Sequence, residues 1–170
     1  PAVQAGRGVR GRLTGHACPV RVYLPLTVRG LTELQRSGRI APAPLAAHAV
    51  LPALRRDWEG ADDEELEYAV LMAAAFDSLA RIAETDDTPR RVVVVADVDD
   101  SHVEVGDDLT AITVTTEVPL ALCAALHLDD SASEGEVAQA LLRLPEAVAG
   151  DGQALGAVSL VSLSRENPLP

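Results

Sequence analysis

Three residues with metal-binding and acid–base side chains lie close together in the middle of the chain: Asp97, Asp99 and His102. They end or follow the run RVVVVADV at residues 91–98, a valine-rich pattern typical of a strand buried on both faces. Side chains two residues apart on a strand point the same way, so both carboxylates could bind one Mg²⁺, with water completing the shell. His102 would add an acid–base group. The sequence thus offers a metal site at Asp97, Asp99 and His102.

The same residues also have a purely structural interpretation. Aspartate and serine favour turns, so Asp99, Asp100 and Ser101 could simply end the buried strand. Turn chemistry alone accounts for these residue types, and both interpretations stay open at this point.

Two other groups of residues raise similar alternatives. Cys123 and His127 are four residues apart and would share a face of a helix, but no third group is evident to orient a nucleophilic pair. A buried, inert thiol is the simpler interpretation of Cys123. His48 lies in an alanine-rich stretch and is expected to be a partly buried structural histidine. The acidic residues 62–67 could face a basic partner, although helix capping explains them more simply.

Charge narrows the range of partners. The chain carries a net charge of −12, and residues 20–150 hold 10 Arg against 24 Asp and Glu, which gives −14. A body this acidic repels phosphate backbones and anionic membrane surfaces, so we expect no nucleic acid and no membrane among its partners. The sequence has no GxxxxGK[ST], GxGxxG, CxxC, HExxH or GxSxG motif, and no cofactor is predicted.

The periodicity of hydrophobic residues and the positions of Gly and Pro predict the helices and strands. Asp62 and Glu65 form a capping-box pair at the start of the clearest helix, and Gly38 and Pro145 are expected to stop or bend others. Strands are predicted at 20–26, 91–98, 111–118 and 124–128, and helices at 28–37, from Pro52 onward, at 62–84 and at 133–148, with an irregular connection at 41–51.

This order of elements predicts an α/β fold of the α+β type, a mixed sheet of about four strands with packed helices. The helical connection between the first two strands is long enough for a right-handed parallel crossover. We expect residues 20–149 to form a single domain. Residues 1–19 are interpreted as a disordered or mis-started extension, and residues 150–170 as a divergent or disordered tail.

Four segments carry a resemblance to a known family: RVYLPLT, EELEYAVLMAA, RRVVVVADV and LHLDD. Together they resemble an uncharacterised family of small actinobacterial proteins that open with an RVYLP-like strand, a domain of unknown function. The resemblance spans roughly residues 20–149 and implies a start near Val20 or Arg21. Its members tend to end in an aromatic segment, which residues 150–170 lack. It implies no activity, ligand or site residue.

Taken together, these observations favour a non-enzymatic protein-interaction or regulatory module with a protein partner. Two cysteines, Cys18 and Cys123, do not suggest a disulfide framework, and no apolar run is long enough for a membrane span, so a cytoplasmic location is expected. The alternative is a metal-dependent enzyme with its acidic site at the end of the 91–98 strand.

Overall fold

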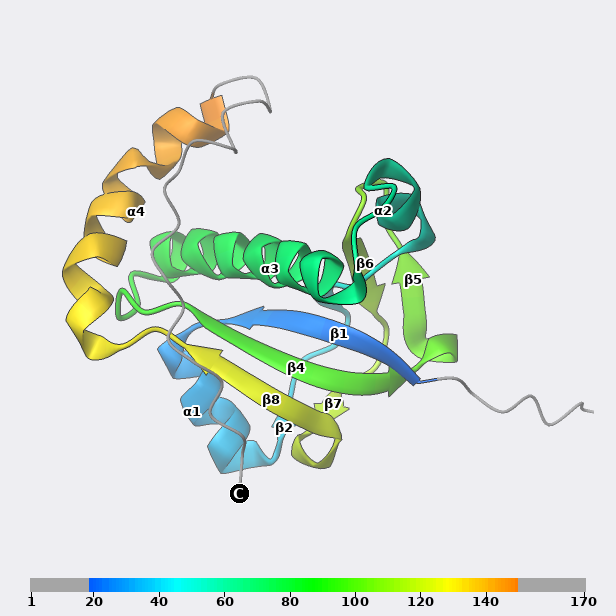
Figure 1. Ribbon diagram of the computed structural model, residues 1–170. Helices are drawn as coiled ribbons and strands as arrows, with labels where there is room; N and C mark the ends of the chain where they lie inside the picture. The colour runs from blue at the N-terminus through cyan, green and yellow to red at the C-terminus, as the bar shows by residue number, and fades with distance from the viewer. Residues whose placement is uncertain (1–18, 150–170) are drawn as a thin grey trace, which may run out of the picture.

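The computed structural model describes residues 19–149 (Figure 1). In chain order its strands and helices are β1 (Pro19–Leu26), α1 (Val28–Ser37), β2 (Arg39–Ile40), β3 (Leu45–His48), α2 (Pro52–Asp57), α3 (Asp63–Thr85), β4 (Val92–Asp99), β5 (Val103–Val105), β6 (Ala111–Val114), β7 (Val118–Pro119), β8 (Cys123–Leu128) and α4 (Glu134–Ala149). Three short 3₁₀ turns connect them: η1 (Asp100–His102), η2 (Leu120–Leu122) and η3 (Ser131–Ser133).

Six of the strands form one sheet in the order β5-β6-β3-β1-β4-β8, and β2 and β7 form a separate ribbon. The predicted α+β class is confirmed, with more strands than the four expected. Every pairing in the sheet is antiparallel, so the predicted parallel crossover from β1 to β4 is wrong. The reason is β3, which lies within that connection and pairs with β1 at Tyr23 and His48, so the connection is not a simple helical one.

The long helix α3 begins where the sequence predicts. Asp62 accepts a hydrogen bond from the backbone N–H of Glu65, and the Glu65 carboxylate accepts one from the backbone N–H of Asp62. The helix lies across one face of the sheet, over β1 and β4 (Figure 1). Ala74 and Ala75 are fully buried there, and such small side chains let the helix axis approach the strands closely.

The alternating residues of β4 separate two hydrophobic clusters. Val93 and Val95 face α3 together with Tyr23, whereas Val94 and Ala96 face the opposite side. That opposite side is covered by α1 and by the β2–β7 ribbon, which contribute Leu34, Ile40 and Val118. The valine run is therefore buried on both faces, as predicted.

Several local predictions need correction. The stretch 41–51, predicted to be irregular, contains β3, and the predicted strand 111–118 is divided into β6 and β7. Residues 103–105, for which no strand was predicted, form β5. Pro145 does not end the last helix, because α4 continues to Ala149. The tails 1–18 and 150–170, for which disorder or divergence was predicted, lie outside the described residues.

Within residues 19–149, no helix combines the length and the apolar character needed to cross a bilayer.

Candidate functional site

The predicted metal ligands are already engaged in local contacts. Asp97 lies directly opposite Arg21 across the β1–β4 pairing, and its carboxylate accepts hydrogen bonds from Arg21 Nε at 3.1 Å and Nη2 at 3.4 Å. Asp99 accepts from the hydroxyl of Ser101 at 2.6 Å and from its backbone N–H at 2.9 Å, which lowers the pKa of Asp99. His102 lies exposed in η1.

Asp97 and Asp99 do share a face of β4, since both are half-buried and alternate with the buried Val98. Their contacts nevertheless match the turn interpretation: Asp99 caps η1 through Ser101. In the part of the chain that the structure describes, no group of three or more His, Cys, Asp or Glu side chains is arranged to hold a metal ion. The metal site at Asp97, Asp99 and His102 thus remains a prediction.

Cys123 and His127 do not come together as a helical pair. They lie on β8, and a register shift opposite Val95 and Ala96 places Cys123 against the cluster on the α1 side of the sheet. Ala125, two residues before His127, packs against the cluster on the α3 side. Because strand residues two apart share a face, His127 is directed away from the thiol. Burial raises the pKa of the Cys123 thiol, which makes it a poorer nucleophile.

His48 has partners that sequence reasoning missed. Its Nε2 lies 3.0 Å from Asp77 Oδ2 on α3, and its Nδ1 lies 2.9 Å from Thr110 Oγ1 just before β6. In the neutral tautomer that suits both, Nε2–H donates to the carboxylate and Nδ1 accepts from the hydroxyl. The arrangement contains the residue types of a nucleophile, base and acid. However, Thr110 is buried and its carbonyl also accepts from Ala49 N at 2.9 Å, so the group acts as a clamp between the sheet and α3.

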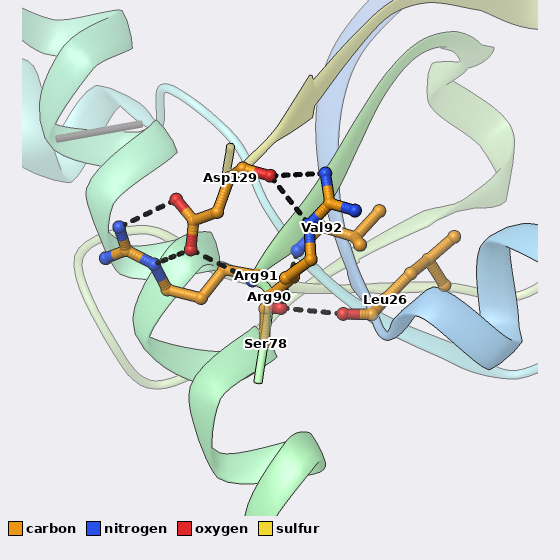
Figure 2. A network of polar contacts seen from close by, with 6 residues as sticks. All are labelled: Leu26, Ser78, Arg90, Arg91, Val92 and Asp129. Atoms are coloured by element: carbon orange, nitrogen blue, oxygen red, sulfur yellow. Dashed lines mark hydrogen bonds and ion pairs between the residues drawn. The ribbon is translucent and has the colours of Figure 1, made fainter. Parts of the chain in front are cut away.

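A second polar network lies where β4 begins and β8 ends (Figure 2). The buried Arg91 guanidinium donates to both oxygens of Asp129, Nε at 2.8 Å and Nη2 at 3.0 Å, and Arg91 N donates to the same carboxylate. Arg90 donates two hydrogen bonds to the carbonyl of Asp129. Beside them, the Ser78 hydroxyl donates to Leu26 O and accepts from Val92 N (Figure 2). These side chains satisfy one another inside the fold, which marks the network as structural.

The turn from α2 to α3 forms a concave part of the exposed surface. A shallow, open depression of about 360 Å³ is lined by Asp57, Trp58, Glu59, Gly60, Ala61 and Glu65, and we call it the Trp58 depression. The chain has one tryptophan, and its side chain is 45 % exposed there. Gly60, with φ of 94°, makes the turn from α2 to the N-cap of α3 in a conformation that favours glycine.

The depression is strongly acidic. Residues 57–68 contain seven carboxylates and no basic residue. Some have internal partners: Asp63 pairs with Arg55 at 2.6 Å, and Glu65 accepts from the cap. Within residues 19–149, no hydrogen bond or ion pair engages Asp57, Glu59 or Glu64, so their charges face solvent.

Tyr23 connects this acidic surface to the core. The ring is buried in the cluster under α3, and burial, followed by the charge and hydrogen bond of Glu67, raises the pKa of its phenol to about 12. Glu67 itself lies on the exposed face of α3. The negative charge of one carboxylate of the acidic helix is thus felt by a phenol that is buried in the core.

A second concave surface is apolar. A groove of about 650 Å³ lies between α1, η2 and β8, and we call it the β8 groove. It is lined by Leu31, Leu34, Gln35, Val94, Leu120, Ala121, Cys123, Ala124 and Leu126. None of these side chains is charged.

Comparison with known proteins identifies a family for this chain but assigns it no activity. No curated protein and no solved structure matches the chain. A family of unknown function, DUF6912, matches residues 20–163, a range that includes every strand and helix described above except the first residue of β1. The chain belongs to this family.

Proposed function

We propose that this domain is a non-enzymatic protein-interaction module that receives an Arg- or Lys-rich segment of a partner protein at the Trp58 depression. The observation that carries the proposal is an exposed indole in a depression whose rim includes carboxylates without internal partners. Aromatic faces attract guanidinium and ammonium groups, and tryptophan does so most strongly. Tyr68, exposed one helical turn from Glu64 and Glu65, extends the same surface.

Charge complementarity specifies the chemistry of the partner. The whole chain carries −12, and the α2–α3 turn concentrates that charge, so a cationic segment would be drawn to it from solution. Asp97 and Asp99, the residues of the enzymatic alternative, are held by Arg21 and Ser101. We also propose a cytoplasmic location, which the free thiol of Cys123 supports because reduced cysteines are usual there.

The single tryptophan makes a direct test possible. A short synthetic peptide that alternates Arg with Ser is titrated into the protein while the emission of Trp58 is followed. We expect a saturable spectral shift and a Kd that rises with salt, because exposed charges are screened over about 8–10 Å. The variant Glu59→Gln/Glu64→Gln should raise Kd about threefold to tenfold, since each exposed ion pair contributes about 0.2–1 kcal/mol.

A matched control separates a site from general attraction. Glu84→Gln/Asp86→Asn removes two charges at the other end of α3, about 30 Å away along the helix. Asn tolerates the left-handed conformation that Asp86 adopts there. This control should leave Kd unchanged. Equal weakening by both double variants would show non-specific attraction to an acidic protein and would refute the proposed site.

A further inference from the structure

Arg55 already brings a guanidinium to the side of the Trp58 depression. It lies three residues before Trp58, and side chains three residues apart start from the same side of a helix. Trp58 still follows the helical pattern of α2, because its backbone N–H donates to the carbonyl of Leu54 at 2.9 Å. Across the turn, Nη1 of Arg55 donates to Oδ1 of Asp63, the first residue of α3, at 2.6 Å. The chain thus holds, beside its own exposed indole, the kind of group that a partner would supply.

The contact between Arg55 and Asp63 can be exchanged at little cost. Its two side chains are 53 % and 77 % exposed, and an exposed ion pair shifts an equilibrium by only about 1.5-fold to fivefold. The caps of α3 come from Asp62 and Glu65 instead, and the buried Leu54 anchors α2. Release of the Arg55 side chain therefore leaves both helices in place.

The carboxylate of Asp63 would remain a suitable site for a cation after this release. It lies in the first turn of a 23-residue helix, where the helix dipole stabilises negative charge. Asp63 differs from Asp57, Glu59 and Glu64 in that a cation of this chain already holds it. A partner can therefore use Asp63 only in exchange for Arg55.

We propose that Arg55 is an internal competitor, which occupies Asp63 in the free domain and is displaced when an arginine of the partner binds. The inference rests on the proposed function, since it describes how the same site is regulated. One guanidinium leaves the carboxylate and another takes its place, so the exchange leaves no charge without a partner.

This competition favours partners that carry several cationic residues. Arg55 is tethered to α2, so its effective concentration at Asp63 is on the order of millimolar, and a single free arginine competes poorly with it. A segment that already contacts Trp58 through one cation is tethered as well, so its next cation competes with Arg55 on similar terms. The internal contact thus selects Arg-rich segments over isolated cations.

Two variants of α2 test the exchange in the full-length protein. Arg55→Gln and Arg56→Gln remove the same charge from the same helix, but the side chains of neighbouring helical residues point about 100° apart. In the titration of Trp58 emission with the Arg–Ser peptide, Arg55→Gln should lower Kd about 1.5-fold to fivefold, because the peptide no longer competes for Asp63. Arg56→Gln should lower Kd less. Equal lowering by both variants would show an effect of net charge alone and would overturn the proposal.

A double-mutant cycle tests whether Asp63 is the carboxylate for which Arg55 and the peptide compete. In the wild-type background, Asp63→Asn should change Kd little, because the contact that the peptide loses is offset by the contact that Arg55 no longer has to give up. In the Arg55→Gln background, the same change should raise Kd about 1.5-fold to fivefold. Equal effects in the two backgrounds would contradict the competition. Circular dichroism of each protein checks that these surface substitutions leave the fold intact.

The internal competitor and the peptide site fail in different ways. If the peptide binds the wild-type protein and binds Arg55→Gln no more tightly, the competitor is refuted and the peptide site stands. Binding that becomes measurable only in Arg55→Gln would support both. If neither protein binds the peptide, the site itself is refuted, and the competitor with it.

Discussion

Replacement of Asp129 by asparagine is expected to cost more stability than the loss of any exposed acid. Asp129 is fully buried, and its carboxylate is the partner of an Arg91 guanidinium that is 5 % exposed. Asparagine has nearly the same size, so the substitution leaves no cavity. What changes is the charge: Arg91 keeps its positive charge inside the fold, without the carboxylate that balances it.

The size of the effect follows from this burial. Removal of one member of a buried ion pair typically costs about 3–5 kcal/mol, because the other charge stays desolvated. A domain of this size has a free energy of unfolding of about 5–15 kcal/mol, so Asp129→Asn should remove a large share of it. The double variant Arg91→Met/Asp129→Leu should recover part of the loss, since apolar residues often replace a buried pair without cost. The recovery is incomplete because the buried backbone N–H of residue 91 loses the carboxylate that accepts its hydrogen bond.

Urea unfolding followed by circular dichroism measures the difference. Asp97→Asn is the matched control, because Asp97 also pairs with an arginine but the two side chains, Arg21 and Asp97, are 50 % and 41 % exposed. It should cost less than about 1 kcal/mol. If Asp129→Asn and Asp97→Asn lower the free energy of unfolding equally, burial does not make the Arg91–Asp129 pair more important for stability than the exposed pair, and the reasoning is refuted.

Four further experiments test other contacts. The raised pKa of Tyr23 means that folding stability is lost as pH rises from about 10 to 12, and Tyr23→Phe should abolish that loss in alkaline denaturation curves. Although burial acts the other way, hydrogen bonds including that from Arg29 N hold the pKa of Asp87 below its ordinary value. The ionised carboxylate of Asp87 therefore stabilises the folded state above the ordinary pKa of an aspartate, and this stabilisation is lost below about pH 4. Asp87→Asn should flatten the fall of the free energy of unfolding at acid pH. His48→Phe should cost about 1–3 kcal/mol in urea unfolding, because a buried hydroxyl loses its partner; no loss would show that the clamp is dispensable. Millimolar Mg²⁺ or Mn²⁺ should leave Tm unchanged, and a rise that Asp97→Asn removes would favour the metal hypothesis.

Local signals in the sequence predicted the elements whose cause is local. The capping pair of Asp62 and Glu65 marks the start of α3, and Gly38 ends α1 in the left-handed conformation. Pro52 begins α2, and the valine run forms a doubly buried strand. Each of these depends on residues within a few positions of one another, so the pattern alone suffices.

Features that depend on distant residues were not predictable. The short strand β3 lies in a proline-rich stretch without alternation, and only its pairing with β6 and β1 defines it. The missed strand in turn made the β1–β4 pairing look parallel. The partners of His48 are 29 and 62 residues away in sequence, and nothing local indicates them. The lone tryptophan among acids at 57–59, by contrast, was a visible signal for the exposed surface that we propose as a binding site.

The Ser78 hydroxyl has a consequence for the fidelity of folding. Four consecutive valines, Val92–Val95, look identical to a partner strand, so β4 could slide along β1 with little change in apolar contact. Ser78 prevents this at one end, because it joins Leu26 O and Val92 N, which face each other in the native alignment. Arg21 and Asp97 match at the other end. Polar contacts at the two ends of β4 thus favour the native register of a repetitive strand over shifted registers, which would otherwise compete with it during folding.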